Sequence, residues 1–142
     1  MLKFFCVFGA LLGFIAVAAG SFGAHGLKDL LEANGYAANW ETAVRYCLFH
    51  AVVLVAICSL ANGSENAGLT TLLTVAAGCF VVGVLIFSGC LGVLAITGIR
   101  ILGAIVPIGG VLLLVGWATL AVAISRLRFL TDFASRVTSL LK

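Results

Sequence analysis

The sequence predicts an all-α polytopic membrane protein with four transmembrane helices in an antiparallel bundle. Of its residues, 63% are hydrophobic and only 9% are charged, against roughly 25% charged residues in soluble domains. The charged residues leave four long stretches free of Asp, Glu, Lys and Arg, and about 20 apolar residues suffice for a helix to cross a bilayer. These observations exclude a soluble domain, a disordered chain, a disulfide scaffold and a nucleic-acid-binding protein.

The four stretches form one predicted transmembrane domain, residues 1–125. Backbone polar groups cannot stay unpaired in lipid, so each stretch is expected to be a helix. The first stretch has some features of a signal peptide, but its apolar run is longer than such a peptide needs, so we expect a retained span. We place the spans near 4–24, 44–62, 70–98 and 101–125.

The third charge-free stretch, 66–99, is too long for one span and too short for two. Residues 66–68 are therefore expected to be a loop. The rest is expected to be tilted, or disturbed at 88–92, where two glycines weaken the helix. Because only 97–100 remain to join the third and fourth spans, these two must be antiparallel neighbours.

A short interfacial helix is predicted after the first span, within 26–35. Three leucines recur there at helical spacing, and Lys28 and Glu32 form an i, i+4 pair. An Asn-Gly pair then ends the helix. The second span follows, with Asn39 as its expected N-terminal cap.

The last residues, 126–142, form a separate basic tail. Apolar side chains recur on one face of this segment, and cations, serines and an aspartate occupy the other. This pattern predicts an amphipathic C-terminal helix on an anionic membrane leaflet. Docking on a partner protein fits the same pattern, and a frayed, solvated tail is the remaining alternative.

The distribution of Lys and Arg predicts the orientation. With four spans, both termini and the 62–69 loop share one side of the membrane. That side carries five Lys and Arg residues, against three on the other side. Because positive charge favours the cytoplasmic side, we expect both termini to be cytoplasmic, in the inner (plasma) membrane of a bacterium.

Polar side chains gather at the membrane face away from the termini. His50 lies deepest, and an ionisable residue inside a span is a functional hypothesis by default; the alternative is a neutral histidine hydrogen-bonded to Tyr46 or to a neighbouring helix. The boundary cations either snorkel to headgroups or hold an anionic lipid. The candidate cluster comprises His25, Lys28, Arg45, Tyr46, His50 and Arg100.

Catalytic and cofactor chemistry is not indicated. Two histidines at unequal depth do not suit haem, and the five cysteines follow no metal or redox spacing. We therefore expect no metal site and no cofactor, and cysteines that serve as small apolar residues. No span contains Asp or Glu, and no nucleophile–base pair or phosphate-binding loop is present. The chain is not expected to be an enzyme.

Small residues predict where the helices pack. They let helices approach closely in lipid, where no hydrophobic force drives association. They indicate a tight bundle, or one that packs on another protein. The predicted packing positions are Gly9, Gly13, Gly20, Gly103, Gly109 and Gly110.

Pro107 lies in the fourth span, where it frees a backbone carbonyl and is expected to kink the helix.

A series of motifs, in order over about residues 5–125, resembles the domain-of-unknown-function 423 family. These are the YgdD-like small membrane proteins, related to transmembrane protein 256 of animals. The chain departs from the family pattern at Cys47, Gly92 and Val106, where Gln, Tyr and Thr are expected. The resemblance implies a multi-span membrane protein and brings no activity with it. The motifs are GSFGAHGL at 20–27, WETAVRY at 40–46 followed by His50-Ala51, LIFSG at 85–89, AITG at 95–98, GAIVPIGG at 103–110 and Gly116-Trp117.

Two functions fit these features. The first is a non-catalytic accessory or packing subunit of a membrane assembly, or a homo-oligomer, which the glycine-rich faces favour. The second is a protein that binds or transports a small molecule or an anionic lipid through the polar cluster on the non-cytoplasmic side. The expected partners are bilayer lipids, including anionic ones, and a membrane protein or a second copy of the chain, with no nucleic acid.

Overall fold

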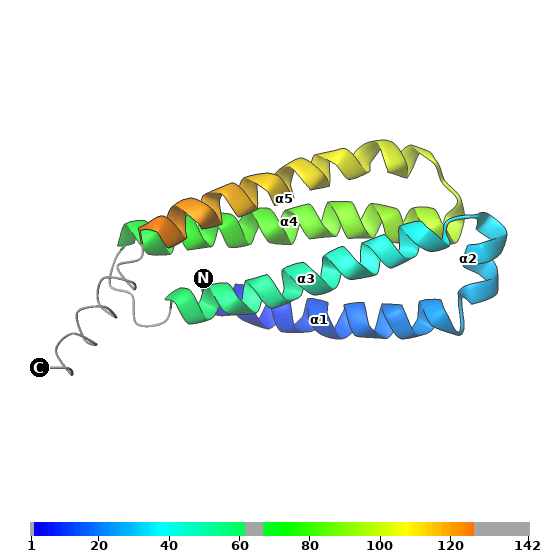
Figure 1. Ribbon diagram of the computed structural model, residues 1–142, viewed down its shortest axis with the longest axis horizontal. Helices are drawn as coiled ribbons and strands as arrows, with labels where there is room; N and C mark the ends of the chain where they lie inside the picture. Colours follow the sequence, from blue (N-terminus) through cyan, green and yellow to red (C-terminus); the bar gives the residue numbers. More distant parts are fainter. Residues whose placement is uncertain (1, 62–66, 127–142) are drawn as a thin grey trace, which may run out of the picture.

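The computed structural model describes residues 2–61 and 67–126, and all regular structure within them is α-helix. Four of the helices are long and apolar enough to cross a membrane. Figure 1 shows these four running alongside one another, with the short helix α2 at one end. The predicted fold class is thereby confirmed. The helices are α1 (Leu2–Ala24), α2 (Lys28–Asn34), α3 (Ala37–Ala61), α4 (Ala67–Thr97) and α5 (Ile101–Ser125).

Helix α3 starts earlier than the sequence pattern suggests. Its first residue is Ala37, so Asn39 lies inside the helix and the prediction that Asn39 caps it is wrong. The backbone N–H groups of Asn39 and Trp40 bond to the carbonyl of Tyr36 at 3.0 and 3.1 Å. These two bonds close the first turn on backbone groups alone. The short helix expected within 26–35 is present as α2, and the predicted tail helix lies outside the described residues.

Helix α4 is continuous from Ala67 to Thr97, so residues 67 and 68, which were expected to lie in a loop, are helical, and the disturbance expected at 88–92 does not occur. Its 31 residues correspond to about 46 Å at 1.5 Å per residue, longer than the roughly 30 Å hydrocarbon core, so α4 must tilt or project from it. Gly89 and Gly92 line an apolar cavity of about 220 Å³ between α1, α3 and α4. The two glycines therefore leave space beside the helix without interrupting it.

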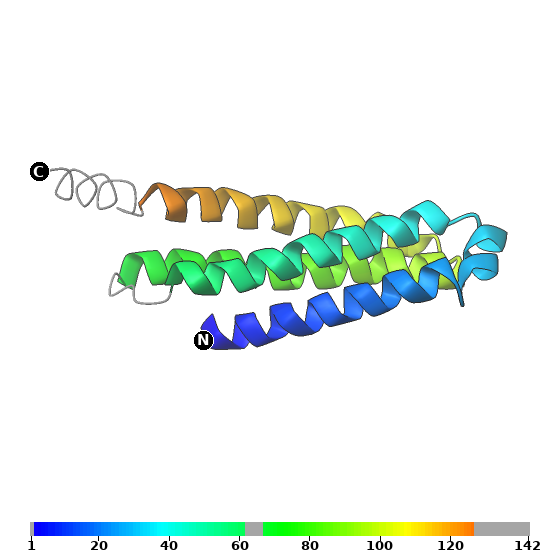
Figure 2. The ribbon, with the colours of Figure 1, turned by 60° about the horizontal axis from the view of Figure 1, so that its bottom comes forward.

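The helices are arranged in the order α1, α3, α4, α5, each packed chiefly against the next. Successive spans are antiparallel, and α1 and α5 occupy opposite edges of the molecule (Figures 1 and 2). The largest fully buried side chains come from α3 and α4, the two inner helices. They are Phe80, Leu54, Ile57, Leu73 and Val84.

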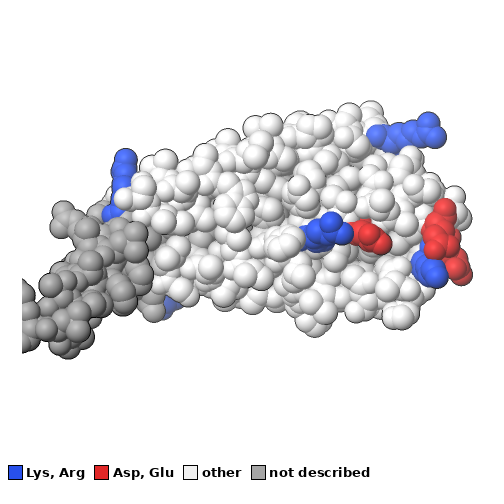
Figure 3. All heavy atoms as spheres, viewed as in Figure 1, with Lys and Arg blue, Asp and Glu red and all other residues white. Residues whose placement is uncertain are grey.

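The outer surface suits a bilayer. Large apolar side chains such as Phe14 and Leu114 are 74% and 70% exposed, which would be costly in water. Figure 3 shows one face without charge along most of its length, with charged side chains towards the ends and one pair of opposite charges part-way along. The apolar surface can therefore contact lipid directly.

The short helix α2 closes the end of the molecule away from the N-terminus. Gly35 ends it in the left-handed conformation, with φ of 73°, and its N–H bonds to the carbonyl of Glu32 at 3.0 Å. The Asn34 side-chain amide donates to the carbonyls of Ala95 and Ile96 at 3.0 and 2.9 Å. These carbonyls lie in the last turn of α4, where intrahelical partners run out. Asn34 thus ends one helix and caps another.

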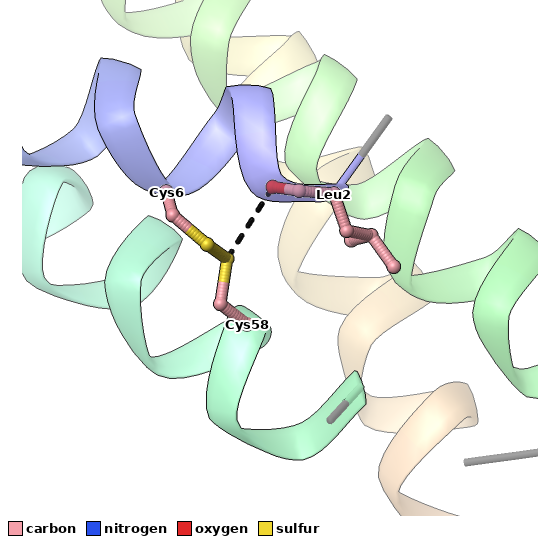
Figure 4. Close-up of a disulfide and its surroundings, with 3 residues drawn as sticks. All are labelled: Leu2, Cys6 and Cys58. Carbon is pink, nitrogen blue, oxygen red and sulfur yellow. Dashed lines mark hydrogen bonds between the residues drawn. A yellow bond between two sulfur atoms is a disulfide. The ribbon is translucent and has the colours of Figure 1, made fainter. Parts of the chain in front are cut away.

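A disulfide between Cys6 and Cys58 joins α1 to α3 near the N-terminal end of the molecule (Figure 4). Their Cα atoms are 6.1 Å apart, within the usual range for disulfides. The sequence-based expectation that these cysteines act only as small apolar residues is therefore wrong for this pair. Cys47, Cys79 and Cys90 are free thiols, and Cys47 is buried.

Candidate functional site

The six residues of the predicted polar cluster separate into different surroundings. Lys28 and Arg45 line a groove of about 550 Å³, which we name the boundary groove. Tyr46 and His50 line a second groove, and the exposed His25 and Arg100 line neither. The boundary groove lies between the end of α1, α2 and the start of α3. Its lining is Gly20, Gly23, Ala24, Lys28, Leu31, Glu32, Ala37, Trp40, Glu41, Val44, Arg45 and Leu48.

The boundary groove contains two cations and two carboxylates. Lys28 and Glu32 come from α2, whereas Glu41 and Arg45 come from α3. In each pair the two residues are four positions apart, one helical turn, so both project from similar faces of their helix. Glu32 and Glu41 were absent from the predicted cluster, which comprised cations, histidines and one tyrosine. Their i, i+4 spacing to Lys28 and Arg45 is the sequence signal that connects them to the site.

Trp40 and Val44 form part of the wall of the boundary groove where α1 meets α3. The Trp40 indole N–H donates to the carbonyl of Ala19 at 3.1 Å. The Trp40 ring packs directly on Gly23, where a Cβ would overlap it, and Val44 lies 3.4 Å from the position a Cβ would take on Gly20. Glycine at these two positions of α1 therefore allows the Trp40 and Val44 side chains to pack directly against α1.

A shallow apolar furrow of about 340 Å³ continues along the α1–α3 contact towards the N-terminal end. Leu48 lines both this furrow and the boundary groove, so the two hollows adjoin on the same side of the α1–α3 pair. We name it the seam furrow. Its lining is Gly9, Ala10, Gly13, Leu48, Ala51, Val52, Val55 and Ala56.

His50 is 5% exposed and both of its ring nitrogens have partners. Nε2 accepts a hydrogen bond from the Trp117 indole N–H at 3.2 Å. An accepting nitrogen carries no proton, so the proton lies on Nδ1, which donates to the carbonyl of Tyr46 at 2.8 Å. This arrangement describes a neutral histidine that links α3 to α5. Of the two interpretations of His50, the geometry matches the structural one.

Aromatic rings surround His50 and form the second groove. Its ring centroid lies 5.3 Å from that of Phe80 and 6.1 Å from that of Trp117, and the Tyr46 and Phe87 rings stack at 4.4 Å. The groove has a volume of about 430 Å³. Pro107 lies on it, inside the continuous helix α5. The remaining lining residues are Tyr46, His50, Phe87, Gly110, Val111, Leu113, Leu114 and Trp117.

The predicted packing glycines contact other helices of the same chain. A Cβ on Gly9 would lie 2.8 Å from Cβ of Leu54, whereas one on Gly13 would lie 3.7 Å from Cβ of Ala51. Gly109 lies against the backbone of α4, and Gly110 and Gly103 have looser neighbours at 3.8 Å. The tightest of these contacts therefore form within the chain.

Sequence reasoning did not pair Trp117 with His50, although a signal was present. An indole N–H buried in hydrocarbon needs an acceptor, and His50 offers one inside a span. Within residues 2–61 and 67–126, no three His, Cys, Asp or Glu side chains are placed to share an ion.

The sequence also matches a described protein family. The profile of "Protein of unknown function (DUF423)" covers residues 19–110, which include the whole lining of the boundary groove and, of the second groove, Tyr46, His50, Phe87, Pro107 and Gly110. This chain belongs to that family. The resemblance seen in the motifs is thereby confirmed, and no catalytic activity comes with the family description.

Bacterial relatives match most of this chain and nearly all of their own length. A UPF0382 membrane protein of Staphylococcus epidermidis is 42% identical over 122 residues, covering 86% of this chain and 95% of the relative. The UPF0382 membrane protein YwdK of Bacillus subtilis is 38% identical, covering 86% and 96%. No solved structure matches the chain. This DUF423 protein is therefore an integral membrane protein of a family without an assigned activity.

Proposed function

We propose that this DUF423 protein binds a membrane phospholipid along the α1–α3 contact. The headgroup lies in the boundary groove and an acyl chain lies in the seam furrow. The observation that carries this proposal is the junction at Leu48, which lines both hollows. A charged groove that leads into an apolar one has the polarity of a phospholipid, which combines a polar headgroup with acyl chains.

The dimensions of the two hollows suit such a ligand. From Glu41 in the boundary groove to Ala56 in the seam furrow is about 22 Å of helix at 1.5 Å per residue. One leaflet contributes about half of the roughly 30 Å hydrocarbon core. The furrow therefore has room for an acyl chain that runs parallel to the neighbouring bilayer lipids.

The accessory-subunit hypothesis loses part of its motivation. That hypothesis depends on glycine faces that are free to contact another protein. However, Gly9 packs on Leu54 of α3, and Gly109 packs on the backbone of Phe87 in α4. Assembly with another protein or a second copy is thus the second candidate. We place the protein in the bacterial plasma membrane with its termini cytoplasmic, on the Lys/Arg distribution.

The test is native mass spectrometry of the protein extracted gently with its lipids. Wild type should carry a bound phospholipid. Arg45→Gln should reduce retention by removing a groove cation, and Ala10→Leu should reduce it by filling the furrow. The matched controls are Arg100→Gln, an exposed cation outside the groove, and Ala121→Leu, an exposed position on α5; both should retain lipid as wild type does.

Each outcome decides between the candidates. Loss of lipid in both test variants, with both controls unaffected, supports the proposal. Bare monomer from wild type, or equal retention in all four variants, overturns it. A lipid-free oligomer or a co-purified membrane protein also overturns it, and would favour assembly.

A further inference from the structure

We infer that the headgroup held in the boundary groove is zwitterionic and combines a phosphate with a primary ammonium. This inference rests on the proposed function and names its ligand class. The groove lining has two positive side chains, Lys28 and Arg45, and two negative ones, Glu32 and Glu41. Its formal charge is balanced, so a ligand of one sign would leave one pair of groove charges without a counterpart.

The order of the charges along α3 fixes which end of the headgroup lies deeper. From the seam furrow outward, the lining residues of α3 include Leu48, then Arg45 and then Glu41. Arg45 lies one turn deeper than Glu41, about 6 Å along the helix axis at 1.5 Å per residue. In a phospholipid the phosphate sits next to the glycerol and the ammonium lies farther out. Arg45 therefore matches the phosphate and Glu41 the ammonium.

The chemistry of each side chain agrees with this order. The Arg45 guanidinium has a planar fork of N–H donors that suits phosphate oxygens. The Glu41 carboxylate has only acceptors and suits a primary ammonium with three N–H donors. Lys28 and Glu32 on α2 supply a second pair at the rim of the groove. A quaternary ammonium has no N–H group and would leave both carboxylates without a hydrogen bond.

The three cations that could together hold an anionic lipid do not line the same groove. Lys28 and Arg45 share the boundary groove, whereas Arg100 at the start of α5 does not line it. In place of the third cation, the groove has two carboxylates. A purely anionic headgroup would therefore offer no positive group to Glu41 or Glu32.

The test titrates delipidated full-length protein with three phospholipids that share the same acyl chains. The probes are phosphatidylethanolamine, phosphatidylglycerol and phosphatidylcholine, and bound lipid is counted by native mass spectrometry. Wild type should bind phosphatidylethanolamine roughly tenfold tighter than either of the others, about 1.4 kcal/mol. Glu41→Gln should abolish this preference, and Arg45→Gln should weaken binding of all three. Arg100→Gln is the matched control and should keep the wild-type preference.

The two proposals fail in different ways. If phosphatidylglycerol or phosphatidylcholine binds as tightly as phosphatidylethanolamine, or if folded Glu41→Gln keeps the preference, the zwitterion is wrong while lipid binding stands. If none of the three probes binds wild type, the proposed function itself is wrong. Circular dichroism of every variant shows that the compared proteins are helical.

Discussion

The α1–α3 contact and the α4–α5 contact are both built on glycine, and the seam furrow lies along the α1–α3 contact. In α4–α5, a Cβ on Gly109 would lie 2.6 Å from the backbone N of Phe87 and 2.8 Å from the carbonyl O of Gly83. In α1–α3, a Cβ on Gly9 would meet Cβ of Leu54 at 2.8 Å, but one on Gly13 only reaches Ala51 at 3.7 Å. Gly109 of α5 thus faces the backbone of Gly83 and Phe87, whereas the nearest atoms to Gly9 and Gly13 of α1 belong to the side chains of Leu54 and Ala51.

This difference shows that glycine spacing alone does not define an interface. A close approach to the backbone does not by itself close a contact, since a Cβ on Gly9 would lie 3.0 Å from the carbonyl O of Ala51 and Gly9 still lines the seam furrow. Where small residues flank the line of contact, as Ala10 and Ala56 do, they leave the seam furrow beside it. The lipid site proposed above depends on this arrangement of small residues.

The largest effect is expected at the α4–α5 contact. Gly109→Ala places a methyl group against backbone atoms of α4 that cannot move aside independently, so the free energy of unfolding should fall by about 3 kcal/mol or more. The measurement is SDS-titrated unfolding followed by circular dichroism. Gly103→Ala is the matched control, because its nearest neighbour would be 3.8 Å away, and it should be neutral or slightly stabilising. Equal stability of the two variants would contradict this account.

The next largest effect concerns the disulfide bond that joins the two helices of the α1–α3 contact. The Cys6–Cys58 disulfide ties α1 to α3, so reduction should lower stability by about 2 kcal/mol. We expect the lower end of the usual range because both helices remain inserted in the membrane when they separate. Protein purified in air without reductant and then denatured should react with maleimide at three thiols before reduction and at five afterwards, since Cys47, Cys79 and Cys90 are free. Five reactive thiols from the start would show that the bond does not form.

The same disulfide tests the orientation. It lies at the N-terminal end of the molecule (Figure 4), which the Lys/Arg distribution assigns to the cytoplasm, where disulfides rarely persist. Cells whose thiols are blocked before lysis should yield the reduced pair if that assignment is right. An oxidised pair would instead favour the inverted orientation.

A smaller effect is expected within the α1–α3 contact. Gly9→Ala brings a methyl group against Leu54, but α1 lies at the edge of the molecule and packs chiefly on α3. It can therefore shift outward, and the free energy of unfolding should fall by only about 1–2 kcal/mol. Gly13→Ala should leave stability unchanged in the same SDS titration. A loss as large as that of Gly109→Ala would remove the distinction between the contacts.

The smallest effect concerns the bond that links the two helix pairs. Trp117→Phe removes the donor to His50 Nε2 and leaves a buried acceptor unpaired, which should cost about 1 kcal/mol. Adding His50→Phe removes that acceptor as well. The double variant should therefore be at least as stable as Trp117→Phe alone in a double-mutant cycle. Further destabilisation equal to that of His50→Phe alone would show that the two side chains act independently.

Much of the fold follows from the sequence because the membrane imposes it. Charge-free stretches must become helices in lipid, and α5, Ile101–Ser125, covers the residues predicted for the fourth span. The prediction was wrong at Asn39, where capping propensity suggested a helix start that α3 does not use. The continuity of α4 through Gly89 also overrides the local weakness of glycine, since hydrocarbon offers the backbone no other hydrogen-bond partner.

The candidate site was predicted only in part. Topology correctly brings Lys28 and Arg45 into one groove, because the end of α1 and the start of α3 meet at α2. It does not determine which way each side chain of α3 projects around the helix axis. That rotation turns the face with Glu41 and Arg45 towards the boundary groove and directs Tyr46 into the groove that His50 also lines.

By itself, the sequence determined four apolar helices, their alternating direction, the short helix between the first two and the end of the molecule at which polar groups gather. Only the tertiary structure decided that Gly9 and Gly109 make different kinds of contact, that His50 is bonded to Trp117, and that carboxylates share the groove with the cations. The physical reason is that burial in lipid depends on composition along the chain, whereas grooves and hydrogen bonds depend on how each helix is rotated against its neighbour.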